Sequence, residues 1–229
     1  MHVHLSEARL LEKTREAAEY ELLNPNQTKN RNAGLKLFVF EEGGQIKFPA
    51  DGRERSYYLL NGRGSFSLEK TTGASRTVID SDTAIWVPAM KAHRIINSGE
   101  GPFRLLLAHC KADANGGRSR SVTLSRARIT EMVGFISRSI WSPETLRSLG
   151  ASKTVGVDLE TLAPRSILGS HEHEEEILYT LRGRGYVLVE SKRYTVRPGS
   201  MVYTGPHLRH SVHNTENDNF QYLVFEFLP

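Results

Sequence analysis

The chain of 229 residues repeats itself, and this repeat limits the folds that it can adopt. Residues 57–64 (Tyr-Tyr-Leu-Leu-Asn-Gly-Arg-Gly) parallel residues 178–185 (Leu-Tyr-Thr-Leu-Arg-Gly-Arg-Gly) in their order of apolar residues and glycines. Residues 88–97 parallel residues 205–214 at nearly the same offset, and the small difference falls in the polar turn 69–75. Similarity at one offset along most of a chain indicates a tandem duplication. We therefore expect two copies of one domain.

Short apolar segments between turn residues predict the fold class of each copy. In the first copy the expected strands are 35–40, 56–61, 65–70, 84–88 and 103–108. Gly43-Gly44 marks one of the reversals between them. The second copy runs from Val155 to a closing strand at 221–227. Short strands with glycine and proline at their ends are typical of an all-β sandwich or barrel.

Three histidines and a glutamate in the second copy have the composition of a metal site. His171 and His173 point to the same face of a strand, because side chains alternate along it. Glu176 follows, and His210 comes one strand, one turn and the start of another strand later. An antiparallel sheet can fold back and bring His210 to the others. Imidazole and carboxylate ligands suit a borderline divalent metal such as Mn, Fe, Zn, Ni or Co.

These residues resemble the two sequence motifs of the cupin superfamily. The first motif is filled by His171, His173, Glu176 and Gly183, and the second by Gly199, Gly205, Pro206, His210 and Asn214. The resemblance extends over nearly the whole chain and implies an all-β fold of two tandem cupin barrels (double-stranded β-helix, or jelly roll) with a short linking helix. The ligands that it implies for one divalent transition metal are His171, His173, Glu176 and His210.

Two glutamates compete for the place of the carboxylate ligand. Glu176 has the spacing to Gly183 that the first motif requires. Glu175, however, shares the parity of His171 and His173 if the strand is unbroken. The step from His173 to Glu176 is also shorter than cupins usually have. We expect a bend or bulge after His173 that resets the parity and makes Glu176 the ligand.

The first copy lacks the equivalent ligands. Ala50, Gly52 and Arg55 occupy the positions that correspond to the first motif, and only His93 and Asn97 remain of the second. A single imidazole without partners is more often hydrogen-bonded within the fold than bound to a metal. We therefore predict a metal-free first copy whose interior either holds a substrate or is packed.

The repeat and the motifs together predict the domain organisation. We expect an N-terminal, degenerate cupin domain at 1–112, a linker at 113–152 and a C-terminal, metal-binding cupin domain at 153–229. Within the linker, Ser142 can cap a short helix that ends at Gly150, where glycine takes the left-handed conformation. Residues 6–23 predict a second helix, although cupins often begin with strands that pair across an interface.

Composition and charge indicate which partners and which cellular compartment to expect. The formal net charge is +4, but acidic residues are interspersed and no nucleic-acid-binding motif is present, so we expect no nucleic acid. The basic stretch 118–128 is interpreted as a solvated linker. No apolar run has the length of a membrane span, Met1–Leu5 does not resemble a secretory signal, and Cys110 is the single cysteine. We predict a cytoplasmic protein, and the resemblance leaves a homodimer open.

The open positions of a metal with four protein ligands indicate catalysis. We expect a metal-dependent enzyme for a small polar metabolite, and the net charge mildly favours an anionic one. Oxygenase, hydrolase, isomerase and decarboxylase chemistry stay open. The candidates for proton transfer or substrate binding are His207, Tyr203 and Tyr179. The alternative is a metabolite-binding or sensor protein whose metal only anchors the ligand; the chain has no DNA-binding segment, which favours the enzyme.

The first testable prediction is one divalent metal per chain, bound by the second copy alone. The double variant His171→Ala/His173→Ala should lose it, because two of four ligands are gone. Elemental analysis of the purified wild type and variant measures the metal content. Equal content in both proteins would contradict the assignment.

Overall fold

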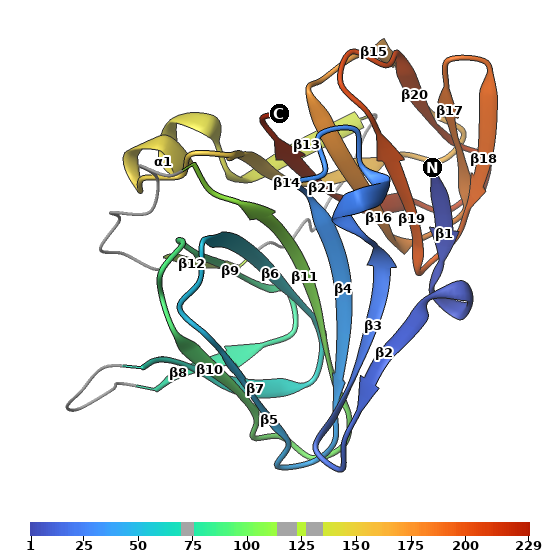
Figure 1. Ribbon diagram of the computed structural model, residues 1–229. Coiled ribbons are helices and arrows are strands. Elements are labelled where there is room, and N and C mark those ends of the chain that lie inside the picture. The colour runs from blue at the N-terminus through green and yellow to red at the C-terminus, as the bar shows by residue number, and fades with distance from the viewer. Residues whose placement is uncertain (70–75, 114–122, 127–134) are drawn as a thin grey trace.

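The computed structural model describes residues 1–69, 76–113, 123–126 and 135–229, and these form two β-barrels side by side (Figure 1). Each barrel consists of one large and one small antiparallel sheet. The chain is therefore an all-β protein of two tandem barrels with one short α-helix among the described residues, as the sequence predicts. Among the described residues, no helix is long and apolar enough to cross a bilayer.

The first barrel has a seven-stranded and a four-stranded sheet. The large sheet has the order β12 (Thr123–Arg126), β9 (Thr83–Val87), β6 (Arg53–Asn61), β11 (Phe103–Lys111), β4 (Gly34–Phe40), β3 (Ala17–Leu23) and β2 (Arg9–Lys13). The small sheet has the order β5 (Gln45–Phe48), β10 (His93–Asn97), β7 (Arg63–Leu68) and β8 (Thr77–Asp80). The five strands expected in this copy are all present, with ends shifted by a few residues.

The second barrel has a six-stranded and a four-stranded sheet. The large sheet has the order β1 (His2–His4), β19 (Ser200–Thr204), β16 (Glu175–Arg182), β21 (Phe220–Phe227), β14 (Thr154–Leu162) and β13 (Phe135–Trp141). The small sheet has the order β15 (Ile167–His171), β20 (His210–Asn214), β17 (Gly185–Val189) and β18 (Lys192–Val196). The closing strand predicted at 221–227 is β21.

The alternation of side chains divides each large sheet into two faces. In β16, Ile177 and Tyr179 belong to a core that residues of both barrels share. Leu178, between them, belongs to the separate core inside the second barrel. Leu106 and Leu107 of β11 divide in the same way between the shared core and the interior of the first barrel. The two barrels thus pack together through the outer faces of their large sheets.

The helix predicted at 6–23 is wrong. A 3₁₀ turn, η1 (Leu5–Glu7), is followed by the antiparallel strands β2 and β3. β3 pairs with β4, and its Leu22 and Leu23 lie buried in the shared core. The local preference for helix was outweighed by the burial and ladder hydrogen bonds that the sheet offers these residues.

The N-terminal residues of the chain are paired into a sheet. β1 pairs with β19, so His2 to His4 add an edge strand to the large sheet of the second barrel. The Met1 ammonium group donates a hydrogen bond to the Tyr203 carbonyl oxygen at 2.8 Å. The first residues of the chain thereby connect the first barrel to the second.

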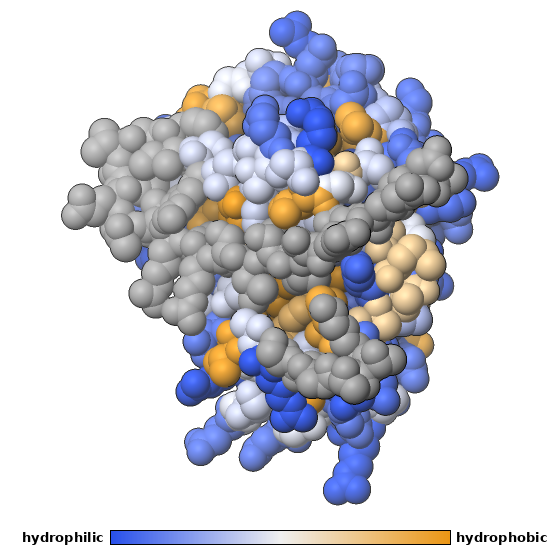
Figure 2. Space-filling model, turned by 90° about the vertical axis from the view of Figure 1, so that its left-hand side faces the viewer, coloured by the Kyte–Doolittle hydropathy of each residue, from blue (hydrophilic) through white to orange (hydrophobic). Residues whose placement is uncertain are grey.

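The segment between the barrels contains the predicted helix, α1 (Pro143–Ser148). Ser142 caps it by accepting a hydrogen bond from the Thr145 amide, and Gly150 has φ +90°. β12 pairs with β9 of the first barrel and β13 with β14 of the second, so this segment also adds strands to both sheets. Most of the basic stretch 118–128 lies outside the described residues. Figure 2 shows the side of the molecule that lies on the left in Figure 1. Hydrophobic residues are visible near the middle of this side, with mostly hydrophilic residues above and below.

A buried carboxylate joins the first barrel to the chain that enters the second. Glu54 of β6 is 1% exposed. Its oxygens accept hydrogen bonds from the amide and hydroxyl of Ser152, at 2.6 and 2.7 Å, and from the amide and hydroxyl of Thr154, at 2.9 and 2.8 Å. The Lys153 amide donates a further bond at 3.3 Å. Such a carboxylate fixes the residues that lead into β14.

The second testable prediction concerns this contact. Glu54→Ala should lower the free energy of unfolding by about 3 kcal/mol, because it leaves several buried donors without an acceptor. Urea unfolding followed by circular dichroism measures the change. Glu42→Ala, which removes an exposed carboxylate of the same barrel, is the matched control and should stay within about 0.5 kcal/mol of the wild type. Equal stability of the two variants would contradict the prediction.

Candidate metal centre

Three strands bring the four predicted ligands together at one end of the second barrel. His171 ends β15, His210 begins β20, and the two residues are directly paired across the small sheet. Glu176 is the second residue of β16 in the large sheet, and His173 lies in the short connection between β15 and β16. One ligand atom from each of the four residues can be chosen so that all lie within 4.8 Å of one another. This cluster can bind a divalent transition metal.

The connection after His171 decides which glutamate joins the cluster. β15 belongs to the small sheet and β16 to the large sheet, so residues 172–174 carry the chain from one sheet to the other. This change of sheet breaks the strand parity, as the spacing of the cupin motif requires. Glu176 consequently lies with the histidines. Glu175 lies on the opposite face, where its Oε1 accepts hydrogen bonds from the Tyr203 hydroxyl (2.5 Å) and the Asn30 amide (3.3 Å).

Backbone hydrogen bonds orient two of the imidazoles. His171 Nδ1 donates to the Gly169 carbonyl oxygen at 2.7 Å, and His210 Nδ1 donates to the Leu208 carbonyl oxygen at 3.1 Å. A ring that donates through Nδ1 presents the lone pair of Nε2 when it is neutral. Such carbonyl contacts are the usual way in which proteins fix the orientation of metal-binding histidines.

Two buried atoms in the cluster have no hydrogen bond of their own. His210 Nε2 and Glu176 Oε2 lie 3.2 Å apart, yet neither is in hydrogen-bonding geometry with any described group. Burial lowers the pKa of His210, but the Glu176 carboxylate outweighs this and raises the pKa above its ordinary value. Buried polar atoms without a hydrogen bond are costly, and a cation between these two would interact with both. The donor set therefore fits a metal ion.

His173 and His171 form the more accessible part of the cluster. The side chain of His173 is 37% exposed, and its Nε2 lies 3.6 Å from Glu176 Oε2. The rings of His171 and His210 have their centroids 4.3 Å apart. Ligands that are buried on one side and exposed on the other leave an approach for a small molecule.

Further carboxylates line the same interior, and the sequence analysis missed them. Glu226 Oε1 lies 3.3 Å from His173 Nδ1, while Asp158 and Glu160 extend from β14. Burial raises the pKa of Glu160 to about 7, and the charges of Glu176 and Asp158 add to the rise. The pKa of Glu226 is also raised to about 7, by burial and then by Glu176. Strand alternation could have identified them, since Asp158 and Glu160 share one face of their strand.

Tyr179 and Tyr203 were predicted beside the ligands, and this placement is wrong. Both side chains belong to the core shared by the two barrels, on the opposite face of the large sheet from Glu176. The Tyr203 hydroxyl accepts a hydrogen bond from the Lys29 amide at 2.9 Å and donates to Glu175. Burial raises the pKa of Tyr179 to about 12. They hold the barrels together and do not reach the cluster.

His207 lies in the turn before β20, at the rim of the cluster. Its amide donates to the His173 carbonyl oxygen at 2.8 Å, and its side chain is 69% exposed, with Nε2 3.7 Å from Glu174 Oε2. Its φ of +58° is one that a glycine would adopt more readily. A role in substrate binding stays a prediction. His213, by contrast, stacks on Tyr186 on the outer face of the small sheet, at a centroid distance of 4.1 Å.

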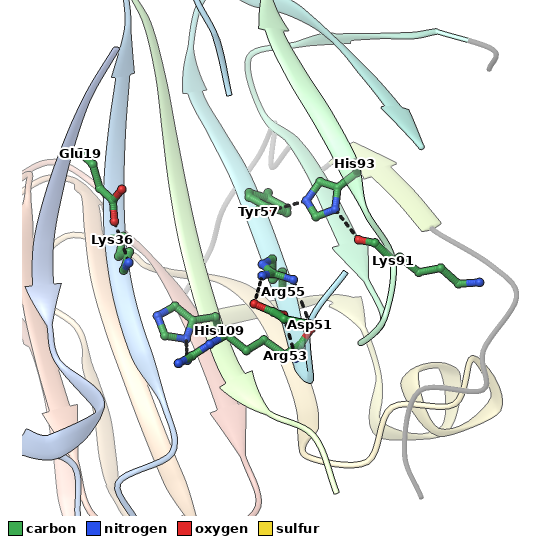
Figure 3. Close-up of polar contacts among 9 residues, drawn as sticks. All are labelled: Glu19, Lys36, Asp51, Arg53, Arg55, Tyr57, Lys91, His93 and His109. Atoms are coloured by element: carbon green, nitrogen blue, oxygen red, sulfur yellow. Dashed lines mark hydrogen bonds and ion pairs between the residues drawn. The ribbon is translucent and has the colours of Figure 1, made fainter. Parts of the chain in front are cut away.

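The surviving histidine of the first barrel is held by hydrogen bonds. His93 Nε2 lies 2.6 Å from the Tyr57 hydroxyl, and its Nδ1 donates to the Lys91 carbonyl oxygen at 2.8 Å (Figure 3). Burial lowers its pKa to about 4. Arg55, in place of the carboxylate ligand, pairs with Asp51 at 2.7 Å. That this barrel binds no metal stays a prediction.

Comparison with known families and structures identifies the second barrel. Residues 158–226 match the family model described as "Cupin domain". This segment is a cupin domain, and the chain has the two-barrel cupin fold. An uncharacterised protein of Methanocaldococcus jannaschii is 25% identical over 96 residues, which are 42% of this chain and 75% of that protein. Glucose-6-phosphate isomerase of Thermococcus onnurineus is 36% identical over 80 residues, which are 34% of this chain but only 41% of the isomerase.

The similar solved structures are two-barrel cupins. A mutant of the Bacillus subtilis oxalate decarboxylase aligns with 100% of this chain and 77% of its own, with a TM-score of 0.78 and 13% identity. The oxalate decarboxylase–formate complex of Lactobacillus farciminis aligns with 98% of this chain and 85% of its own, with a TM-score of 0.77 and 12% identity. At such identities the similarity shows the fold and leaves the reaction open.

The third testable prediction separates the two glutamates. Glu176→Gln should weaken metal binding by about 100-fold or more, because it removes a charged ligand, whereas Glu175→Gln should change it by less than about 10-fold. Competition with a fluorescent chelator measures both affinities. A larger loss in Glu175→Gln would mean that the bend between β15 and β16 is absent in solution.

Proposed function

We propose that the protein is a metal-dependent enzyme that transfers a proton on a small polar metabolite bound in the second barrel. The observation that carries this proposal is the presence of further carboxylates beside the ligand cluster. His171, His173, Glu176 and His210 lie together, and carboxylates with pKa values near 7 stand beside them. A purely structural metal site needs no such groups, whereas perturbed carboxylates next to an open metal are typical of catalytic sites.

The metal would supply Lewis acidity, polarising a carbonyl or hydroxyl oxygen of the substrate. Glu176 and His210 form the buried side of the cluster, while His171 and His173 are partly exposed. The substrate would therefore approach past the partly exposed side. A structure of the Bacillus enzyme with the same fold is described with Mn(II) centres, which supports Mn among the candidate ions.

Glu160 is the residue that we propose to carry the proton. It extends from β14 into the barrel, directly across from Tyr222 of β21, and a carboxyl group with a pKa near 7 exchanges protons readily at neutral pH. A bound cation would favour its ionised form, and thus its role as a base. The hydroxyl of Tyr222 is buried in the same interior.

The charges of this interior favour isomerisation over decarboxylation of a dicarboxylate. Asp158, Glu160 and Glu226 add negative charge to that of Glu176, and this repels a dianion such as oxalate. The acidic lining thus argues against an anionic substrate, which the net charge of the chain mildly favoured. The Thermococcus relatives, 36–38% identical, are named isomerases. Moving a proton between two carbons of a hydroxy-carbonyl compound is the step that such a lining can support.

The alternative function is a metabolite-binding protein in which the metal only anchors its ligand. It would require the same cluster but no proton transfer. The two functions differ in what happens to a bound compound, because an isomerase exchanges a carbon-bound hydrogen with solvent.

The fourth testable prediction uses that exchange. In D2O with added Mn(II), the protein should incorporate deuterium into a hydroxy-carbonyl compound of a panel of uncharged sugars, as followed by 1H NMR. Glu160→Gln should lower kcat by about 100- to 10,000-fold with metal retained. His210→Ala should abolish turnover without unfolding the barrel, because the core beneath does not contain it.

The control is His213→Ala, which removes a histidine from the outer face of the same strand and should leave turnover unchanged. Release of CO2 from oxalate, without deuterium exchange in the panel, would replace isomerisation by decarboxylation. Tight binding with only unaltered compounds recovered under every metal and oxygen condition would favour the binding protein.

A further inference from the structure

The first barrel has a cavity of its own at the end of its interior. Its volume is about 640 Å³, enough for a small metabolite, and β3, β4, β5, β6 and β11 contribute to its wall. Phe38, Phe48 and Leu107 supply apolar surface, and Arg53, Arg55 and His109 line the polar part. Figure 3 shows the last three side chains gathered between β6 and β11.

The strand registers of the two barrels show which positions correspond. Arg55 is paired with Val87 and His109, as Glu176 is paired with Thr204 and Glu226. The Glu176 carboxylate of the metal cluster thus corresponds to a guanidinium, and Glu226 to an imidazole.

The same correspondence extends to β4. Lys36 faces Leu107 across the ladder, as Asp158 faces Val224. The next interior position, Glu160 in the second barrel, is Phe38 in the first. The interior that is acidic around the metal ligands in the second barrel is therefore cationic and partly aromatic in the first. The lining of the second barrel suits a cation, whereas the corresponding lining of the first barrel suits an anion.

Among the described residues, acidic side chains around the cavity offset two of these cations but leave the Arg53 guanidinium without a carboxylate partner. Glu12 and Glu21 also line the cavity, and Glu21 pairs with Arg9. Lys36 pairs with Glu19 at 2.6 Å and Arg55 with Asp51 at 2.7 Å. Within the part of the chain that the structure describes, the Arg53 guanidinium forms no ion pair with a carboxylate. Its Nη1 donates a hydrogen bond to His109 Nδ1 at 3.0 Å. Burial, and then the charge of Arg53, lower the pKa of His109 to about 3, so the imidazole is neutral.

Arg55 has the geometry of an anion ligand. Its side chain is only 5% exposed, and of its five N–H groups the ion pair with Asp51 and a 3.4 Å contact to the Arg53 carbonyl oxygen use two. A planar guanidinium offers paired donors that match a carboxylate or phosphate. Its carbon lies 5.9 Å from the centre of the Phe48 ring, which places an apolar surface beside the charge.

We propose that the cavity of the first barrel binds a small organic anion, a carboxylate or phosphate on an apolar body, through Arg53 and Arg55. The apolar body would pack against Phe48 and Phe38. The duplicated chain then has two sites of opposite character, a metal centre in one barrel and a metal-independent anion site in the other. This inference stands apart from the proposed catalytic function.

Binding of phenylacetate and of phenyl phosphate to the full-length protein tests the proposal by isothermal titration calorimetry in EDTA. Sodium chloride at matched ionic strength controls for general screening. At least one of the two should bind with one site per chain, and which one binds identifies the acid group. Binding should persist in His171→Ala/His173→Ala, which separates this site from the metal centre.

Arg55→Gln and Arg53→Gln should each weaken binding about 10- to 100-fold, because each removes charged hydrogen bonds to the anion. Arg53 is exposed enough for its variant to fold even if Arg55→Gln does not. Arg63→Gln, which removes an exposed arginine of the same barrel that does not line the cavity, is the matched control and should change affinity less than about 2-fold. No binding above the chloride control, or an equal loss in Arg63→Gln, would overturn the proposal.

Discussion

Each large sheet of this protein has two buried faces, and the rest of the structure depends on that constraint. One face packs against the other barrel and the other face lines the barrel's own interior. The outer faces form the core that the two barrels share, so residues such as Tyr179 and Tyr203 that point there pack between the barrels. Polar side chains that point inward, such as Glu176, are gathered at the open end of the barrel. A shift of one residue along a strand would move a side chain from the face between the barrels to the face inside the barrel.

The shared core also explains why the ends of the chain and the linker do not follow the boundaries of the copies. β1 joins the sheet of the second barrel although it precedes the first, and Glu54 of the first barrel accepts bonds from the residues that enter β14. The division of the chain at residues 112 and 152 stays a prediction, but β1 from the first range belongs to the large sheet of the second barrel. Two cupin barrels joined in this way are expected to unfold together, because exposing one large sheet would expose the other.

The fold followed from the sequence where the signal was local and periodic. The glycine turns, the strands between them and the cap of α1 at Ser142 were all visible. The segment from residue 6 to 23 was not, because its charges and alanines are compatible with a helix and only the distant partner β4 makes it a strand. The grouping of His171, His173 and Glu176 with His210 was predictable from motif spacing. Asp158, Glu160 and Glu226 belong to no motif, and only the alternation of Asp158 and Glu160 along one strand could have indicated that they share a face.

Duplication gives the chain two similar scaffolds, and charge separates what they can bind. In the second barrel a dication offsets the carboxylates, so that metal and protons compete for the same interior. As the pH falls, His210 and the carboxylates take up protons and the affinity for metal must decrease. The anion site that we propose for the first barrel uses guanidinium groups instead, which remain charged in proteins. A site built on guanidinium groups thus stays competent under conditions that empty a site built on imidazole and carboxylate, and the two barrels need not respond to pH together.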